Sequence, residues 1–459
     1  MKIKHRLIRL CLLTAGLLAV SPAATAQTYT VLKSFTNILD GAYVYSTLRL
    51  DGRTLYGTTD QGGSAGFAGY GTVFKINTDG TDYKLLKDFT NNADGAYPDG
   101  ALTLGGNVLY GTTRIGGDSD GGTVFKVNTD GTGFARIMSF DANSLVAANQ
   151  PYAGLVLFNN VLYGTTARGG RGSDGTVFKV NTDGTGYTVL HDFFGSGYGD
   201  GAVPFAGLTL SGNVLYGTTY AEGDGGQNGT VFKINTDGNG YTILYNFAGN
   251  PDGANPSGGL ILSGNVLYGT TTAGGNAQDG GTLFKINTDG TGYAVIKRFP
   301  GDREGSPQAE LSLMGNTLYG TTSDCFGSVF QIHTDGTGYT PLKNYIYEPN
   351  DGLDPITGVT LAGNTIYGTT YEGGDFGGPF IGYGTIFSMS LVPTLTIVVA
   401  GNQAILSWPI WAPNFSLQST TNLAAPAWTA VTDAPVVIGA NNVVTNAISG
   451  IQQFYRLNQ

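Results

Sequence analysis

The phrase Leu-Tyr-Gly-Thr-Thr occurs six times in this chain and returns once more as Ile-Tyr-Gly-Thr-Thr. Its tyrosines are Tyr56, Tyr110, Tyr163, Tyr216, Tyr268, Tyr319 and Tyr367. The spacings between them are 54, 53, 53, 52, 51 and 48 residues. A period near fifty residues is typical of a propeller blade, whereas a solenoid coil usually needs only about 20–30 residues. The repeat therefore favours a propeller over a β-solenoid or a stack of sheets.

One repeat, residues 206–247, has the pattern of four short strands separated by turn residues. Ser-Gly-Asn lies between the first two strands, a polar glycine-rich loop follows the second, and Asn-Thr-Asp-Gly follows the third. Short strands joined in this way predict one antiparallel sheet for each repeat. The expected strands cover residues 206–210, 214–219, 229–235 and 241–247.

The two ends of the repeat region are complementary. A fourth-strand pattern already occurs at residues 29–35, before any complete repeat, whereas the last repeat stops after its third strand at residues 384–390. Pairing of these two segments would use every strand and leave no open sheet edge. The sequence therefore predicts an all-β fold: a seven-bladed β-propeller over residues 27–391, closed by its N-terminal strand.

The recurring residues indicate how the sheets pack. Leu, Tyr, Val and Phe occupy both faces of the inner strands, as expected for a sheet covered on both sides by neighbours; Phe232 is one such residue. The glycine of Tyr-Gly-Thr-Thr is predicted to let a neighbouring blade approach closely. Asn-Thr-Asp-Gly supplies residues that tolerate the left-handed backbone of a tight turn.

These pieces resemble the Gloeo/Verruco (GloVer) tandem repeat of exported bacterial proteins. Tyr-Gly-Thr-Thr, a Gly-Gly loop, Gly-Thr-Val-Phe-Lys and Asn-Thr-Asp-Gly recur in that order over residues 29–390. The resemblance implies a secreted or surface-associated propeller. It implies no known activity and no catalytic residues, so catalytic residues stay unassigned.

Residues 1–26 have the pattern of a signal peptide. A basic start is followed by the apolar run 10–20 and by Ala24-Thr25-Ala26, a small-x-small cleavage pattern. We therefore expect export to the extracellular space or cell surface, with the periplasm as a possible location. The apolar run is too short for a stable membrane anchor, and no second one follows, so we expect no transmembrane segment.

Charge and cysteine content exclude some partners and cross-links. With 33 acidic and 23 basic residues, the formal net charge of −10 argues against binding nucleic acid or anionic membranes. Cys325 is alone after the predicted signal peptide, so an intrachain disulfide is excluded and packing must stabilise the fold. The oligomeric state is not indicated.

Residues 392–459 lack Tyr-Gly-Thr-Thr and form a separate predicted domain. Their seven short apolar segments predict a small β-sandwich, similar to fibronectin-type or immunoglobulin-like modules. Surface attachment, sorting, oligomerisation and simple packing on the propeller all remain open as its role. The expected strands cover residues 395–399, 404–408, 415–418, 428–431, 436–438, 443–445 and 454–457.

The loops sort onto two rims of the predicted ring. The tight turns lie on one rim, and the variable loops after Thr-Thr and around Asp-Gly-Ala lie on the other, where function is expected. The variable rim is rich in acidic and aromatic residues, which suit the hydroxyls and apolar faces of sugars. The repeated aspartates themselves are interpreted as loop-closing residues. Residues that break the repeat are better candidates for ligand binding, and we select Arg114, Arg168, Tyr220, Tyr371 and Glu372.

Three functions remain open at this point. The first is a scaffold that binds a polysaccharide or a surface protein through the variable rim. The second is a polysaccharide hydrolase or lyase that uses a pair of acids on the same rim, and the third is a purely structural exoprotein. We expect no cofactor; calcium stays an alternative because Asp118 and Asp120 lie in an oxygen-rich loop, although that loop lacks the twelve-residue spacing of a calcium-binding hand.

Overall fold

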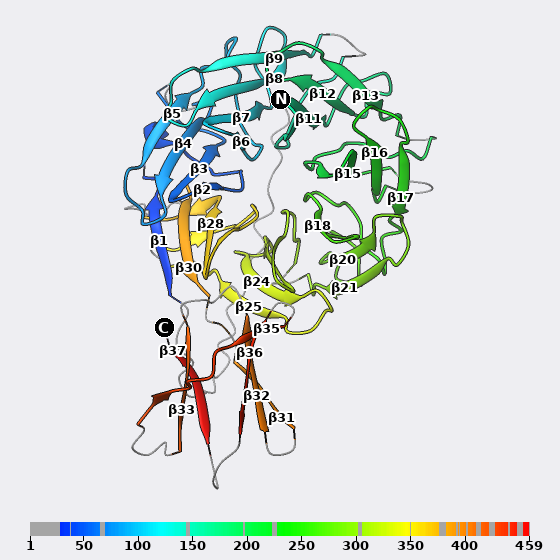
Figure 1. Ribbon diagram of the computed structural model, residues 1–459. Helices are drawn as coiled ribbons and strands as arrows, with labels where there is room; N and C mark the ends of the chain where they lie inside the picture. Colours follow the sequence, from blue (N-terminus) through cyan, green and yellow to red (C-terminus); the bar gives the residue numbers. More distant parts are fainter. Residues whose placement is uncertain are drawn as a thin grey trace.

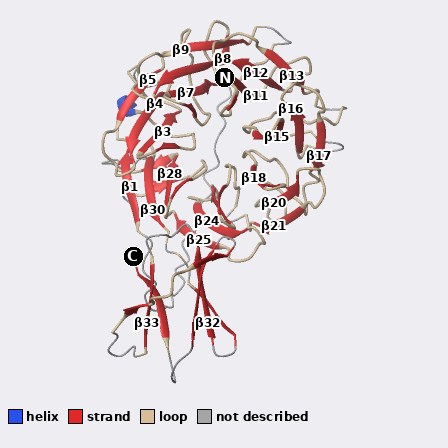
Figure 2. Cartoon of the chain, viewed as in Figure 1, coloured by secondary structure: helices blue, strands red, loops and turns tan. Residues whose placement is uncertain are grey.

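The computed structural model is built almost entirely of strands and loops (Figure 2). One short 3-10 helix, η1 (Ile38–Asp40), occurs among the described residues. The predicted signal peptide at residues 1–26 lies outside them. In the described part of the chain, no helix is both long and apolar enough to cross a membrane. The described residues are 28–458 without 37, 65–68, 144–146, 196–197, 223–226, 302–304, 349, 376–381, 392, 394, 401–402, 410–414, 422–426, 439–440 and 448–452.

Six antiparallel sheets of four consecutive strands follow one another around a ring in the described chain (Figure 1). The first three are β2 (Arg49–Asp51), β3 (Thr54–Thr59), β4 (Thr72–Asn77), β5 (Lys84–Asp88); β6 (Thr103–Gly105), β7 (Val108–Thr113), β8 (Asp120–Asn128), β9 (Ala135–Asp141); and β10 (Val156–Phe158), β11 (Val161–Thr166), β12 (Thr176–Asn181), β13 (Thr188–Asp192). The next three are β14 (Thr209–Ser211), β15 (Val214–Thr219), β16 (Thr230–Asn235), β17 (Thr242–Asn246); β18 (Ile261–Ser263), β19 (Val266–Thr271), β20 (Thr282–Asn287), β21 (Ala294–Arg298); and β22 (Ser312–Met314), β23 (Thr317–Thr322), β24 (Ser328–His333), β25 (Thr340–Asn344).

The next sheet in the ring takes strands from both ends of the repeat region. β27 (Thr360–Ala362), β28 (Thr365–Thr370) and β30 (Thr385–Ser390) are completed by β1 (Tyr29–Ser34), in the order β1-β30-β28-β27. β1 pairs antiparallel with β30, and Tyr29 lies opposite Met389. The predicted pairing of the first strand with the last repeat is thus confirmed. A two-strand ladder, β26 (Gly352–Leu353) with β29 (Glu372–Gly373), joins two loops beside this sheet.

Apolar side chains fill the space between neighbouring sheets. In one cluster, Tyr163 and Val177 of the third sheet pack against Leu215 and Phe232 of the fourth, and Phe232 is 0% exposed, as the sequence predicted. A corresponding cluster joins the closing sheet to the first sheet through Tyr367 and Phe74, so the apolar contacts continue around the ring. The ring of sheets is therefore propeller-like and carries its core between sheets rather than in one central layer.

The repeated glycine has a different role from the one predicted. Gly217 lies opposite Phe232 in the β15–β16 ladder. A Cβ atom at Gly217 would lie 2.5 Å from Cζ of Phe232 and 3.0 Å from Cδ2 of Leu208, both in the same repeat. The glycine therefore makes room for the phenylalanine across its own sheet, and not for a neighbouring blade. The same Gly–Phe opposition recurs in the other six sheets of the ring.

The C-terminal segment forms two small antiparallel sheets. One has the order β31-β32-β36-β35 and the other β34-β33-β37. Ala404, Leu406, Trp408, Leu417 and Val444 form a buried cluster to which both sheets contribute. The strands lie where the sequence predicted them: β31 (Thr396–Ala400), β32 (Gln403–Pro409), β33 (Ser416–Thr420), β34 (Thr429–Ala430), β35 (Val436–Ile438), β36 (Asn441–Ala447) and β37 (Phe454–Asn458).

Candidate functional site

A cavity of about 340 Å³ lies on the axis of the ring and receives residues from every sheet around it. Just before the first strand of each sheet, one residue lines the end of the cavity that faces the variable loops. We call these residues the mouth ring: Tyr45, Asp99, Tyr152, Phe205, Ser257, Gln308 and Ile356. Two residues later, a second position also faces the axis, because side chains alternate along an extended chain. We call this set the middle ring: Thr47, Ala101, Gly154, Gly207, Gly259, Glu310 and Gly358.

Aromatic side chains occupy one side of the mouth ring. Tyr152 and Phe205 meet edge to face with ring centroids 5.1 Å apart, and Phe205 meets Tyr220 at 5.3 Å. Tyr45 is another aromatic residue of the mouth ring, and its ring centroid lies 5.9 Å from that of Tyr371. Ser257 and Gln308 supply a hydroxyl and an amide to the opposite wall of the cavity. The cavity therefore has an aromatic wall and a hydrogen-bonding wall.

A charged cluster supports the aromatic wall. Arg114 Nε lies 3.3 Å from Asp99 Oδ2, and Arg114 Nη2 lies 3.6 Å from Asp60 Oδ1. The guanidinium also lies over two rings, with its Cζ 5.0 Å from the centroid of Tyr97 and 5.4 Å from that of Tyr152. Arg114 thus fixes two carboxylates and two tyrosines in one place beside the cavity.

Asp99 is the most perturbed acid of this cluster. Its side chain is buried, and burial together with the negative charge of Asp60 holds the pKa of Asp99 well above its usual range, although Arg114 acts in the opposite direction. Asp99 Oδ1 is buried without a hydrogen-bond partner among the described residues. Asp99 is therefore suited to keep a proton beside the carboxyl group of Asp60.

Of the five predicted binding residues, Arg114, Tyr220 and Tyr371 come together around the mouth ring. Arg168 does not join them: its side chain is exposed, and its backbone pairs with Asn149 at the periphery. Glu372 lies in β29, where it pairs with Leu353, and its charge adds to burial in raising the pKa of Tyr43. Glu372 is thus close to the aromatic wall but outside the residues that line the cavity.

Sequence reasoning placed Tyr152 among the aromatic residues of the variable rim but missed Asp60, Asp99, Tyr45 and Phe205. The signal was present in one aligned position, the residue that follows each Tyr-Gly-Thr-Thr, which changes in almost every repeat. The sequence analysis selected three residues at this position, Arg114, Tyr220 and Tyr371. It did not select Asp60, nor the mouth-ring position in front of each first strand. The residues that follow the seven copies are Asp60, Arg114, Ala167, Tyr220, Thr272, Ser323 and Tyr371.

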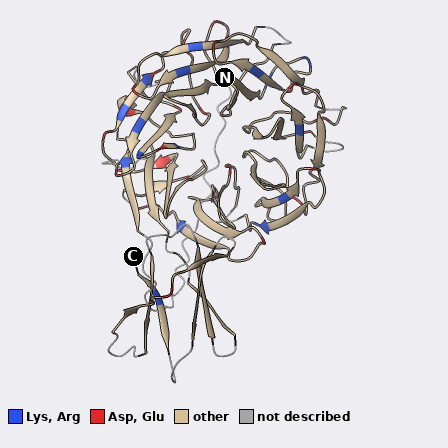
Figure 3. Cartoon of the chain, in the orientation of Figure 1, with Lys and Arg blue, Asp and Glu red and all other residues tan. Residues whose placement is uncertain are grey.

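The repeated aspartates of the variable loops have structural partners. Lys33 and Asp40 form an ion pair at 2.6 Å, and Asp252 accepts a hydrogen bond from the hydroxyl of Tyr245 at 2.6 Å. In the loop considered for calcium, Arg136 donates to both carboxylate oxygens of Asp118, at 2.7 and 2.8 Å. Basic residues are spread around the ring and form no single patch in Figure 3. Among the described residues, no group of three His, Cys, Asp or Glu side chains is placed to hold a metal ion.

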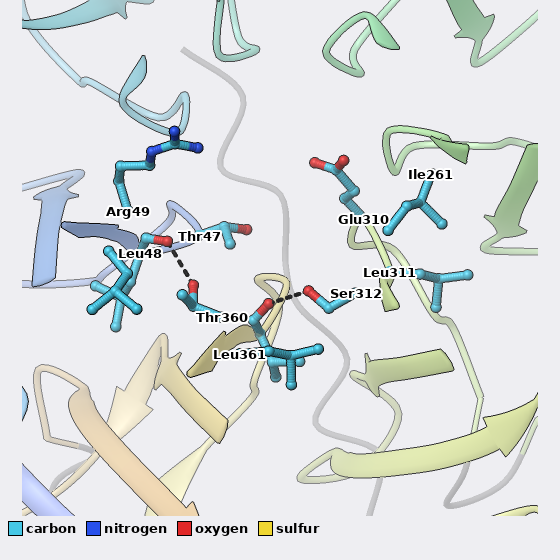
Figure 4. A pocket seen from close by; sticks show the side chains of 11 residues that line it. Thr47, Leu48, Arg49, Ile261, Glu310, Leu311, Ser312, Thr360 and Leu361 are labelled. Atoms are coloured by element: carbon cyan, nitrogen blue, oxygen red, sulfur yellow. Dashed lines mark hydrogen bonds between the residues drawn. The ribbon is translucent and has the colours of Figure 1, made fainter. Parts of the chain in front are cut away.

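A second cavity of about 440 Å³ continues along the axis toward the tight-turn rim (Figure 4). Thr47, Arg49 and Glu310 line both cavities. Thr360 donates a hydrogen bond to the carbonyl oxygen of Leu48 at 2.6 Å, which ties the closing sheet to the first one. The Glu310 side chain is exposed to the channel, and its enclosure by the surrounding sheets disfavours the charged form and raises its pKa to about 7.

The chain is similar to one family model and to two solved structures. The model of the Gloeobacter/Verrucomicrobia repeat matches residues 17–156 and 142–327. A solved structure of a GH74 enzyme from Niastella koreensis is similar with a TM-score of 0.51 at 14% identity, covering 83% of this chain and 59% of that one. A nidogen/laminin complex is similar with a TM-score of 0.39 at 16% identity, covering 59% of this chain and 89% of that one. The chain thus spans 59% of the GH74 structure's length, and no curated protein matches it.

Proposed function

The chain belongs to the Gloeobacter/Verrucomicrobia repeat family, and from that premise we propose that it is an exported protein that binds a saccharide in its axial cavity. In this proposal, residues 27–391 form a seven-bladed propeller, and residues 392–459 form a β-sandwich that follows it. The order of strands in the ring and the β1–β30 pairing support the first part. The two C-terminal sheets around one apolar cluster support the second.

The observation that carries the proposal is the aromatic wall of the mouth ring. Tyr45, Tyr152 and Phe205 present ring faces and edges to one cavity, and the apolar face of a sugar packs well on such rings. Ser257 and Gln308 lie across the cavity, where a hydroxyl and an amide can hydrogen-bond to sugar hydroxyls. A volume of about 340 Å³ lies within the usual range for small-ligand sites.

Arg114 has a positioning role in this proposal. Its contacts with Asp60, Asp99 and Tyr152 hold the aromatic wall in place before a ligand arrives. A site that is already ordered loses less conformational entropy on binding. The proposal requires no cofactor.

A saccharide array followed by calorimetry tests the proposal. Tyr152→Ala or Phe205→Ala should weaken binding of the best saccharide by about tenfold or more, since each removes a stacking surface. Tyr198→Ala is the matched control, because Tyr198 is 75% exposed on the same rim and does not line the cavity. Saccharide binding that survives both cavity variants would contradict the proposal. Binding of a surface protein that sugars do not compete with would contradict it as well.

A second function, polysaccharide cleavage, is favoured by one observation. Asp60 and Asp99 share Arg114, and burial together with the charge of Asp60 raises the pKa of Asp99. A carboxyl group with a raised pKa that lies near a second carboxyl group is the usual equipment of a hydrolase that acts on sugars. Turnover of a polysaccharide panel that is abolished by Asp99→Asn, with binding retained, would establish this function. Binding without turnover would reject it and leave the binding role.

A further inference from the structure

Glu310 interrupts a ring of small residues at the centre of the axial channel. At the same position, the other repeats have Thr47, Ala101 or a glycine. Its carboxylate packs over the neighbouring repeat at Gly259, where an added Cβ would lie 3.3 Å from Cδ and 3.4 Å from Oε2 of Glu310. The middle ring is therefore built from small residues except where this one acidic side chain enters the channel.

The Glu310 carboxylate has no ion-pair or hydrogen-bond partner among the residues that the structure describes. Figure 4 shows Glu310 and Arg49 extending from opposite walls toward the space between them. Arg49 belongs to the next layer, two residues beyond Thr47, and is the only basic side chain lining either cavity within the described chain. Glu310 is thus an acidic group that faces the cavity and has no partner among the described residues.

Glu310 shares its cavity with the aromatic wall. Tyr45, Tyr152 and Phe205 line the mouth of that cavity, and Glu310 lines its deeper part. Aromatic faces attract cations, and the attraction is strongest where water is excluded. A carboxylate behind such rings adds a direct partner for a protonated amine. Resting on the saccharide-binding function, we propose that the ligand is an amino sugar with a free amine, whose ammonium group pairs with Glu310.

The order of charges along the channel favours a cation over an anion. A ligand that enters from the variable rim meets Asp99 and then Glu310 before it reaches Arg49. An acidic sugar would therefore meet the Glu310 carboxylate before Arg49, whereas an amine would meet a partner there. Arg114, the other cation at the mouth, is already paired with Asp60 and Asp99. N-acetylation would remove the charge on the ligand's nitrogen, so a glucosamine oligomer should be distinguished from its acetylated form.

Calorimetric titration of the full mature chain with three matched oligosaccharides tests this inference. The probes are oligomers of glucosamine, N-acetylglucosamine and glucose of equal length. The glucosamine oligomer should bind about tenfold more tightly than the glucose oligomer. Glu310→Gln should remove this preference, so that the glucosamine and glucose oligomers bind the variant with equal affinity. Asp51→Asn is the matched control, because Asp51 is exposed near the other rim, outside both cavities, and should change nothing.

The outcomes separate this inference from the function on which it rests. If no saccharide binds, the proposed function fails. If the glucose or acetylated oligomer binds as tightly as the glucosamine oligomer, and Tyr152→Ala weakens both, the function stands and the amine inference is overturned. A preference for glucosamine that survives Glu310→Gln would also overturn it. Glucosamine binding that is lost in Arg49→Gln but kept in Glu310→Gln would place recognition at Arg49 and would contradict the inference as well.

Discussion

Lys343 on β25 lies over the ring of Tyr29 on β1, with its Nζ 4.9 Å from the ring centroid. The same ammonium forms an ion pair with Asp351 at 2.6 Å. Equivalent lysines join other neighbouring sheets, as Lys33 does over Tyr83 at 4.2 Å. The N-terminal strand is therefore held by the same inter-sheet contact that links sheets formed within one repeat.

Closure by β1 predicts a specific cross-link. Thr30 and Ser388 are opposite each other in the β1–β30 ladder, and opposed residues of an antiparallel pair lie about 4.5–5.5 Å apart at Cα, within disulfide range. In a Cys325→Ser background, Thr30→Cys with Ser388→Cys should form an intramolecular disulfide on oxidation, detected by mass and by gel mobility. Thr30→Cys with Ser407→Cys, which lies in β32, is the unpaired control. Cross-links only between separate chains would show that the ring is not closed in this way.

Lys343→Met should destabilise the ring by about 1–3 kcal/mol, because it removes a cation–π contact and leaves Asp351 without its partner. Lys84→Met on β5 is a control, because Lys84 is exposed. The comparison is made by chemical denaturation. Equal stability of the two variants would mean that the contact with Tyr29 has no role in closure.

The opposition of Gly217 and Phe232 predicts coupled substitutions. Phe232→Ala should lower the free energy of unfolding by about 3–5 kcal/mol, and Gly217→Ala by about 1–3 kcal/mol, because the added methyl meets the phenylalanine ring. In a double-mutant cycle, the two losses should sum to more than the loss in the combined variant. Strict additivity would be inconsistent with the contact.

The tight-turn aspartates predict acid sensitivity. Hydrogen bonds from the side chain and backbone of Thr81 lower the pKa of Asp79, and Asp130 and Thr132 repeat the arrangement. Because the pKa of each carboxyl group is lower in the folded chain, its ionised form stabilises the fold. This contribution is complete above the unfolded pKa of about 3.9 and is lost as the pH falls through the pKa of the folded chain. The melting temperature should therefore drop below about pH 4, and less steeply in Asp79→Asn with Asp130→Asn. Identical pH profiles for the variant and the parent chain would contradict this.

Glu310 predicts the opposite slope at higher pH. Burial raises its pKa from 4.5 to about 7, so the folded chain holds this proton more tightly than the unfolded chain does. The contribution of the Glu310 carboxyl group to the free energy of unfolding is therefore most favourable below pH 4.5 and declines until about pH 7. Glu310→Gln should consequently gain melting temperature relative to the parent chain between those values. If the difference in melting temperature between Glu310→Gln and the parent chain stays constant across that range, the Glu310 carboxylate is fully hydrated in the folded chain.

The sequence was sufficient for the ring and for part of the site. The offset of residues 29–35 against 384–390 predicted the β1–β30 pairing, because strand pairing between the ends depends only on pattern and count. The role of Gly217 was predicted wrongly, because it depends on the register that places it opposite Phe232. Arg114, Tyr220 and Tyr371 were found because they break the repeat in a loop.

Glu310 and Phe205 were missed for a different reason. Both lie in the extended segment before a first strand, where apolar and small residues indicate packing. In this segment, only the direction of a side chain decides whether it enters the core between sheets or lines the channel. That direction follows from alternation along the segment, and Leu311, adjacent to Glu310, points into the inter-sheet core. Which residues of this segment face the channel can be assigned only once the arrangement of the sheets in the ring is known. The repeat pattern alone does not give that arrangement.

The most direct measurement is a crystal structure of the mature chain with a bound glucosamine oligomer. The account predicts a sugar ring in the axial cavity, in contact with Tyr152 and Phe205, with its amine within hydrogen-bond distance of Glu310. A saccharide bound on the outer rim or on the C-terminal sheets, with the axial cavity free of it, would contradict the account.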